Sequence, residues 1–277
     1  MTRLLFTSCG LLAASVAVSI AAWAASSVES RSGSLLERRF ADPDVSFLLL
    51  DARTGETIAS RWVDVGQPVP LGSLVKPFAA LAYGAGHSFR YPTFHCSRAS
   101  GCWHPPGHGP LNLSQALAHS CNHYFRQLSA QVAAEDLAYV TTRFGLPAPP
   151  QVSGPDAYWG LGEDWRIEPA ALLRAYLALS RPPTMPGSAP ILQGLALSAR
   201  QGTAKGVGAA LRQAPALAKT GTGPCVHRPN AGGDGFVAAL YPADQPRYVL
   251  LVRAHGKTGR RAAEIGGAML QVLIEGE

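Results

Sequence analysis

The residues that could do chemistry begin with a serine and a lysine three positions apart, Ser73 and Lys76. If a helix starts at or just before Ser73, this spacing puts both side chains on one face, close enough for a hydrogen bond. A serine hydroxyl is a weak nucleophile until a base takes its proton, and a lysine becomes such a base when burial lowers its pKa. The pair predicts a serine nucleophile with a lysine general base, although so short a motif needs support from elsewhere in the chain.

A second motif follows in a segment with helical spacing, where Ser120 and Asn122 stand two residues apart. Their hydroxyl and amide could face one cavity if the backbone loses its helical regularity at this point. The Ser120 hydroxyl could then relay a proton between Lys76 and a leaving group, while the Asn122 amide holds both the substrate and the lysine. By itself, a polar stripe on an amphipathic helix explains the two residues equally well.

The third motif is Lys219-Thr220-Gly221-Thr222, which follows a short apolar run and so lies on or at the end of a strand. Its cation and two hydroxyls could bind a carboxylate, and Gly221 would let a substrate backbone lie against the strand. The backbone N–H after that glycine could form an oxyanion hole together with the N–H of Ser73.

Lysine is rare in this chain, which strengthens these assignments. Only four of the 24 basic residues are lysines, and two of the four are Lys76 and Lys219. Arginine cannot lose its proton in a protein, whereas a desolvated lysine can. A second Lys-Thr-Gly, at 257–259, we interpret as a turn leading into the last helix.

Hydrophobic patterns indicate the elements that position the motifs. Apolar runs predict an antiparallel hairpin from strands 45–51 and 57–62 and three late strands at 217–222, 235–241 and 248–254. Helical spacing is seen at 113–132 and 168–180, and a closing helix is expected at 261–274. Early and late strands with helices between them predict an α+β fold, in which one sheet is assembled from both ends of the chain and a helical lobe lies beside it.

The motif order S-x-x-K, S-x-N and K-T-G matches the set found in penicillin-binding proteins and serine β-lactamases. From about Val45 to Leu273 the chain resembles a penicillin-binding protein transpeptidase domain. The segments Phe47–Glu56, Cys102–Trp103, Ser120–Phe125 and Gly202–Ala204 resemble the segments that flank these motifs in the family. The resemblance implies an antiparallel five-stranded sheet flanked by helices, together with an all-α lobe.

The same resemblance implies a D,D-transpeptidase or D,D-carboxypeptidase that acts on peptidoglycan stem peptides and is inhibited by β-lactams, with no cofactor and no metal. Ser73 would be the acylated residue, Lys76 its base, Ser120 the proton relay and Asn122 the anchor for substrate and lysine. Lys219, Thr220, Gly221 and Thr222 would form the carboxylate site.

Two alternatives remain open. The compact spacing of the motifs is also similar to that of a class D β-lactamase, as are Tyr158, Trp159 and Trp165, but Asn122 stands where that class carries an apolar residue. The other alternative is a non-catalytic sensor or scaffold that is acylated once. No glycosyltransferase or pedestal domain is seen ahead of residue 45, which predicts a minimal form that needs a cell-wall synthesis partner for placement.

The amino terminus predicts export. Arg3 precedes an uncharged stretch over residues 4–24, which is typical of a signal peptide or a single membrane anchor. Residues 25–44 are expected to be a linker with a short helix near Leu35–Phe40, so the domain at 45–277 would be periplasmic or extracytoplasmic. The net charge of +6 is scattered over the 277 residues, which argues against nucleic-acid binding.

Four cysteines follow the amino-terminal stretch. Outside the cytoplasm, Cys96 and Cys102 are the local candidates for a disulfide, and Cys121 is expected to be a small buried side chain. The histidines near the first pair, His95, His104 and His108, raise a zinc site as a weaker alternative, because their spacing fits no familiar zinc finger.

Overall fold

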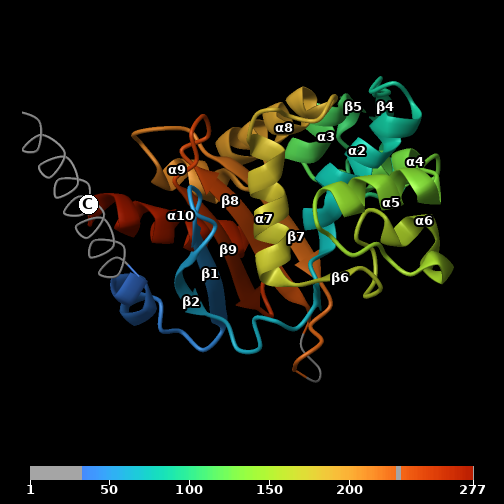
Figure 1. Ribbon diagram of the computed structural model, residues 1–277. Coiled ribbons are helices and arrows are strands. Elements are labelled where there is room, and N and C mark those ends of the chain that lie inside the picture. Colours follow the sequence, from blue (N-terminus) through green and yellow to red (C-terminus); the bar gives the residue numbers. More distant parts are fainter. Residues whose placement is uncertain (1–32, 229–231, 277) are drawn as a thin grey trace, which may run out of the picture.

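The protein, described by a computed structural model over residues 33–228 and 232–276, is built on an antiparallel five-stranded sheet (Figure 1). The strand order is β2-β1-β9-β8-β7, so strands from both ends of the chain form one sheet, as predicted. The strands are β1 (Val45–Asp51), β2 (Thr57–Arg61), β7 (Leu217–Gly223), β8 (Asp234–Tyr241) and β9 (Tyr248–His255).

Burial explains why the central strands are almost entirely apolar. Every residue of β1, β8 and β9 is buried, because helices cover both faces of the sheet. Successive side chains point to opposite faces, so Leu48 and Leu50 join one hydrophobic core while Phe47 and Leu49 join the other.

Helices form two groups around the sheet (Figure 1). Helices α9 and α10 pack on one face, in the core that contains Phe47. The other face carries α7 and the helical lobe, whose residues share the core that contains Leu48. The helices are α2 (Lys76–Gly86), α3 (Leu113–Ala118), α4 (Asn122–Ser129), α5 (Ala134–Arg143), α6 (Gly154–Ala157), α7 (Pro169–Ser180), α8 (Ser188–Gln201), α9 (Lys205–Ala210) and α10 (Gly259–Glu275).

Short elements complete the lobe. Two-stranded ladders join β3 (Val69–Pro70) to β6 (Arg166–Ile167) and β4 (Phe94–Cys96) to β5 (Gly109–Leu111). Single 3-10 turns occur at η1 (Gly72–Val75), η2 (Arg98–Ser100) and η3 (Gln151–Ser153).

Two sequence expectations are refined by the structure. The helical segment at 113–132 is broken into α3 and α4, because Ser120 adopts a left-handed conformation between them. Residues 33–39 are helical, and Leu36 is fully buried in the core under α10, so this part of the predicted linker packs onto the domain.

The predicted signal or anchor at 1–24 lies outside the described residues. Within the described ranges, no helix combines the length and the apolar character that crossing a membrane requires.

Candidate active site

Ser73 lies on a 3-10 turn that leads directly into α2, with Lys76 as the first residue of that helix. The serine is half-buried, whereas its neighbours Leu74 and Val75 are fully buried. The Tyr176 hydroxyl donates to the carbonyl of Leu74 over 2.7 Å and ties the turn to α7. The predicted helix start at Ser73 is therefore confirmed. The structure adds that packing holds the backbone of this turn in place.

Ser120 forms the break between α3 and α4, with φ of +50°. This left-handed conformation costs a non-glycine residue roughly 1 to 3 kcal/mol, and such outliers gather at functional sites. Two donors hold it there: Lys76 Nζ donates to the Ser120 carbonyl over 3.0 Å, and Trp103 Nε1 donates to the same oxygen over 3.1 Å. The loss of helical regularity that the second motif requires is confirmed.

Lys76 is fully buried, and its ammonium group faces the second motif. Besides the Ser120 carbonyl, Nζ donates to Asn122 Oδ1 over 2.8 Å and to Ser120 Oγ over 3.4 Å. Burial lowers the pKa of Lys76 to about 7, although the nearby thiols of Cys121 and Cys102 oppose this effect. The expected hydrogen bond to Ser73 is not among the bonds of the described residues, because these three oxygens already accept the ammonium protons.

Lys219 is also fully buried and approaches the same hydroxyl from the sheet side. Its Nζ donates to Ser120 Oγ over 2.8 Å and to the Thr220 carbonyl over 2.7 Å. Burial, together with the charge of Lys76, holds the pKa of Lys219 well below its usual value. Lys219, which the sequence predicts to be part of a carboxylate site, thus contacts the Ser120 hydroxyl, and its role toward a substrate stays a prediction.

A cleft of about 500 Å³ opens between the sheet and the lobe. Six of the eight predicted site residues line the cleft: Ser73, Ser120, Asn122, Thr220, Gly221 and Thr222. The other two, Lys76 and Lys219, are buried behind them. The structure therefore brings the three motifs to one place.

The cleft has further walls that sequence reasoning did not assign. Trp103, Thr203 and the segment 258–260 also line it. Thr203 accepts a 2.6 Å hydrogen bond from the Thr220 hydroxyl, and Gly259 N donates to Thr222 Oγ1 over 3.3 Å. The second Lys-Thr-Gly is indeed a turn into the last helix, since Thr258 caps α10, but it also brings Arg260 to the cleft. Only the tertiary structure, which places the second triplet beside the first, reveals that Arg260 reaches the cleft.

Gly221 has a structural role that the sequence did not predict. A Cβ at this position would collide with the Leu71 carbonyl and press on Leu74, because the turn that carries Ser73 packs directly on β7. The glycine thus allows this turn to approach the strand, and its predicted contact with a substrate backbone stays a prediction.

Cys96 and Cys102, the local candidates for a disulfide, are not paired in the structure. Cys96, Cys102 and Cys121 are free, and together with His108 they converge in what we name the lobe cluster. His108 Nδ1 lies 3.6 Å from Cys96 Sγ and 3.7 Å from Cys102 Sγ, and the Sγ atoms of Cys102 and Cys121 are 3.8 Å apart. Three sulfurs and one imidazole at these separations match the donor set and edge lengths of a tetrahedral zinc site.

The electrostatics of the lobe cluster differ from one ligand to the next. Burial raises the pKa of the Cys121 thiol to about 12, which opposes its ionisation before a metal ion binds. Burial opposes ionisation of Cys102, but backbone N–H groups of His104, His123 and Asn122 lower the pKa of its thiol overall. Burial lowers the pKa of His108 to about 4, which keeps its imidazole neutral. The cluster could hold zinc and would then brace the Ser120 turn, since Cys121 lies in that turn. The sequence-based expectation that the protein binds no metal stays a prediction, and the geometry of the lobe cluster argues against it.

Comparison with known proteins shows which fold and family the chain shares. No curated protein sequence matches the chain. Among solved structures, Pseudomonas aeruginosa PBP2 in complex with WCK 5153 is 17% identical, with a TM-score of 0.69 over 90% of this chain and 74% of that one. The TP domain of Burkholderia pseudomallei penicillin-binding protein 3 is 17% identical, with a TM-score of 0.65 over 90% of this chain and 92% of that one.

Helicobacter pylori PBP2, solved in complex with MreC, is 15% identical and has a TM-score of 0.74 over 88% of this chain and 62% of that one. At such identities these likenesses show the shared fold. Residues 45–271 match the family model described as the penicillin binding protein transpeptidase domain. The chain therefore belongs to the penicillin-binding protein transpeptidase domain family.

Proposed function

We propose that the protein is a D,D-transpeptidase or D,D-carboxypeptidase, which cleaves the D-Ala-D-Ala end of peptidoglycan stem peptides through an acyl-enzyme at Ser73. The observation that carries the proposal is the buried Lys76, three residues after Ser73, whose pKa is near 7 and whose amine is held at the second motif. An amine that is partly neutral at physiological pH can accept a proton, as a general base must.

In the proposed first step, Lys76 accepts the Ser73 hydroxyl proton while the Ser73 oxygen bonds to the substrate carbonyl carbon. The tetrahedral intermediate collapses as the carbon–nitrogen bond to the terminal D-Ala breaks. The leaving amine takes a proton from Lys76 by way of the Ser120 hydroxyl, which contacts both lysines. Lys219 keeps that hydroxyl in place, and its own low pKa limits the positive charge buried beside Lys76.

The substrate carboxylate is assigned to the cleft wall formed by Thr220, Thr222 and Arg260. Lys219 has no exposed surface, whereas the Arg260 guanidinium is exposed at the cleft, 5.4 Å from the Trp103 ring centroid. Arginine binds carboxylates with two parallel hydrogen bonds, so it is well suited to recognise a peptide terminus.

The class D β-lactamase alternative is less well supported. That class uses a carboxylated lysine, and here Asn122 Oδ1 accepts a hydrogen bond from the Lys76 ammonium at the place where an added carboxylate would stand. The sensor alternative keeps the same acylation step but lacks turnover. The enzyme and the sensor therefore differ only in the fate of the acyl group on Ser73.

We further infer that the domain works outside the cytoplasm, delivered by the segment at 1–24, and that it is placed by a cell-wall partner protein. Support for a partner is indirect: one similar structure is a complex of PBP2 with MreC, and another belongs to a peptidoglycan synthase complex.

The proposal is tested by intact mass after incubation with benzylpenicillin. A stable one-to-one adduct is expected for the parent and for Ser180→Ala, whose serine is also half-buried but lies at the end of α7. No adduct is expected for Ser73→Ala, and an adduct on that variant would disprove the nucleophile assignment.

Release of D-Ala from a stem pentapeptide then tests the enzyme itself. Adduct formation without D-Ala release indicates a sensor and contradicts the proposed activity. Rapid penicillin hydrolysis that depends on bicarbonate indicates the β-lactamase.

A further inference from the structure

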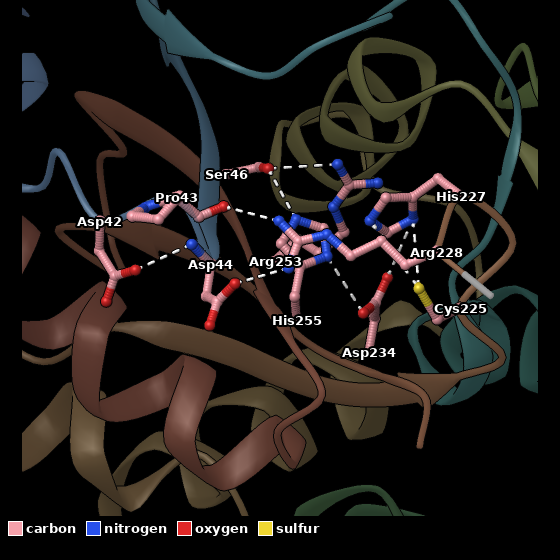
Figure 2. A network of polar contacts seen from close by, with 10 residues as sticks. All are labelled: Asp42, Pro43, Asp44, Ser46, Cys225, His227, Arg228, Asp234, Arg253 and His255. Carbon is pink, nitrogen blue, oxygen red and sulfur yellow. Dashed lines mark hydrogen bonds and ion pairs between the residues drawn. The ribbon is translucent and has the colours of Figure 1, made fainter. Parts of the chain in front are cut away.

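A second group of metal-ligating side chains lies away from the cleft lining, at the end of the sheet. Cys225 and His227 belong to the connection from β7 to β8, Asp234 is the first residue of β8 and His255 is the last residue of β9. We name these four residues the hairpin cluster. Figure 2 shows their side chains turned toward one another from three separate segments of the chain.

The donor atoms of the hairpin cluster all lie within 4.8 Å of one another. Cys225 Sγ is 3.4 Å from His227 Nδ1, which is 3.6 Å from Asp234 Oδ2, while Asp234 Oδ1 is 3.2 Å from His255 Nδ1. A tetrahedral zinc ion with bonds of about 2.0 to 2.3 Å sets its donors roughly 3.3 to 3.7 Å apart. The three separations given above agree with that geometry, with His227 facing one oxygen of Asp234 and His255 facing the other.

A proton relay of the Cys-His-Asp kind does not explain this arrangement. In such a relay the thiol and the carboxylate bind different nitrogens of the imidazole. Here Cys225 Sγ lies closer to Nδ1 of His227, at 3.4 Å, than to Nε2, at 3.8 Å, and Asp234 Oδ2 also approaches Nδ1. Donors that converge on one point, and do not form a chain, are typical of metal coordination.

The neighbouring arginines contribute positive charge near the hairpin cluster, but both also have other partners. Arg228 pairs with Asp44 over 2.6 Å, and Arg253 donates to Ser46 Oγ over 3.2 Å (Figure 2). Arg253 also lies 4.4 Å from the Trp62 ring centroid. On metal binding the Cys225 thiol would lose its proton, and a divalent cation would balance the thiolate and the Asp234 carboxylate.

An outer contact orients one of the ligands. The second ring nitrogen of His255, Nε2, lies 3.3 Å from the Ser46 hydroxyl. Metal-binding histidines usually hold their other nitrogen in such a hydrogen bond, which fixes the ring for coordination. His255 and Asp234 are also almost fully buried, so half of the donor set is rigidly placed by the sheet.

We propose that the hairpin cluster is a structural zinc site, with Cys225 Sγ, His227 Nδ1, one Asp234 oxygen and His255 Nδ1 as ligands. Asp234 pairs with Gly223 and with His255 in the sheet, and Thr222 is the next residue along β7. The ion therefore clamps the β7–β8 connection onto β9, one residue beyond the strand segment that lines the cleft.

Zinc content of the purified full chain, measured by mass spectrometry after zinc loading and gel filtration, tests the proposal. Because the lobe cluster could also bind zinc, the readout is the difference from the parent. Cys225→Ser and Asp234→Asn should each lose one equivalent. Arg228→Ala, which removes a neighbouring charge but no ligand, should lose none. Cys102→Ser, in the lobe cluster, should leave the hairpin equivalent in place.

Equal zinc content in the parent and in Cys225→Ser would overturn the proposal. If either ligand variant misfolds, as judged by circular dichroism and penicillin labelling, His227→Gln replaces it, since this side chain is exposed and supports no core. The same loss of one equivalent is expected, and its absence counts equally against the site. Hydrogen exchange of β7 and β8 should quicken in the variant that lacks zinc.

Discussion

Lys76 and Lys219 point at the same oxygen, Ser120 Oγ, from distances of 3.4 and 2.8 Å. Both lysines are completely buried, which lowers the pKa of each, and the charge of Lys76 lowers the pKa of Lys219 further. Two buried ammonium groups this close cannot both stay charged at little cost, so the pair supplies a neutral amine near physiological pH. The Ser120 hydroxyl couples the two lysines, because its oxygen accepts a hydrogen bond from each of them.

The rate of acylation by benzylpenicillin should increase with pH through about 7. The pKa of Lys76 is lowered to about 7, so the neutral, proton-accepting form dominates above that pH and is lost below it. A stopped-flow profile from pH 5.5 to 8.5 should rise about tenfold per unit on the acid side and then level off. Lys76→Arg should lower the rate by at least ~10²-fold and remove the inflection. A flat parent profile contradicts the assignment.

Asn122→Asp should move that inflection to higher pH. The substitution puts a carboxylate where Oδ1 now accepts from Lys76 Nζ over 2.8 Å, and a contacting opposite charge favours the ammonium form. An upward shift of about 1 to 3 pH units is expected. Asn122→Ala is the matched control, because it removes the hydrogen bond without adding charge. The idea fails if both variants titrate at the same pH.

Arg260→Gln should weaken the first binding step and leave the limiting acylation rate unchanged. The residue lines the cleft with an exposed guanidinium, so it contributes charge recognition of the carboxylate and no proton transfer. An increase of about 10-fold in the half-saturating penicillin concentration is expected, the size of one charge-assisted hydrogen bond. Arg261→Gln, whose arginine pairs with Glu264 over 2.7 Å, should behave like the parent. Equal effects of the two substitutions would count against a specific role.

Gly221→Ala should destabilise the protein by about 1 to 3 kcal/mol, as overpacking of a tight contact does. Its Cβ would press on the Leu71 carbonyl and on Leu74, and so push the turn that carries Ser73 away from β7. Urea denaturation measures the loss, and penicillin labelling should slow in parallel. Gly66→Ala is the control, since a Cβ there meets open space. Equal stability of the two variants would show that the turn can move at no cost.

Cys102→Ser should reduce zinc content by one equivalent and slow penicillin labelling. Its sulfur is one of four donors in the lobe cluster, and its neighbour Trp103 holds the Ser120 carbonyl. Ser97→Ala, which alters a nearby hydroxyl outside the donor set, should leave both measurements unchanged. Unchanged zinc content in Cys102→Ser would exclude the lobe cluster as a metal site.

The sequence by itself predicts the strands of the sheet and the candidate residues of the three motifs. The apolar runs of β1, β8 and β9 predict strands, and the helix start at Ser73 follows from a local motif. Such features depend on residues that are close in the chain, so spacing and residue type are sufficient to predict them. The break at Ser120 is only a condition of the second motif, and in the structure it is held by Lys76 and Trp103.

Only the tertiary structure decided which distant residues meet. The packing of the sheet against the lobe brings Arg260 to the cleft, places Lys219 against Ser120, and turns Gly221 toward Leu71. It also joins Cys96 and Cys102, the candidates for a disulfide, with Cys121 and His108 in the lobe cluster. These contacts join residues that are remote in the chain, and their distances are set by how the sheet and the lobe pack together, which no local spacing encodes.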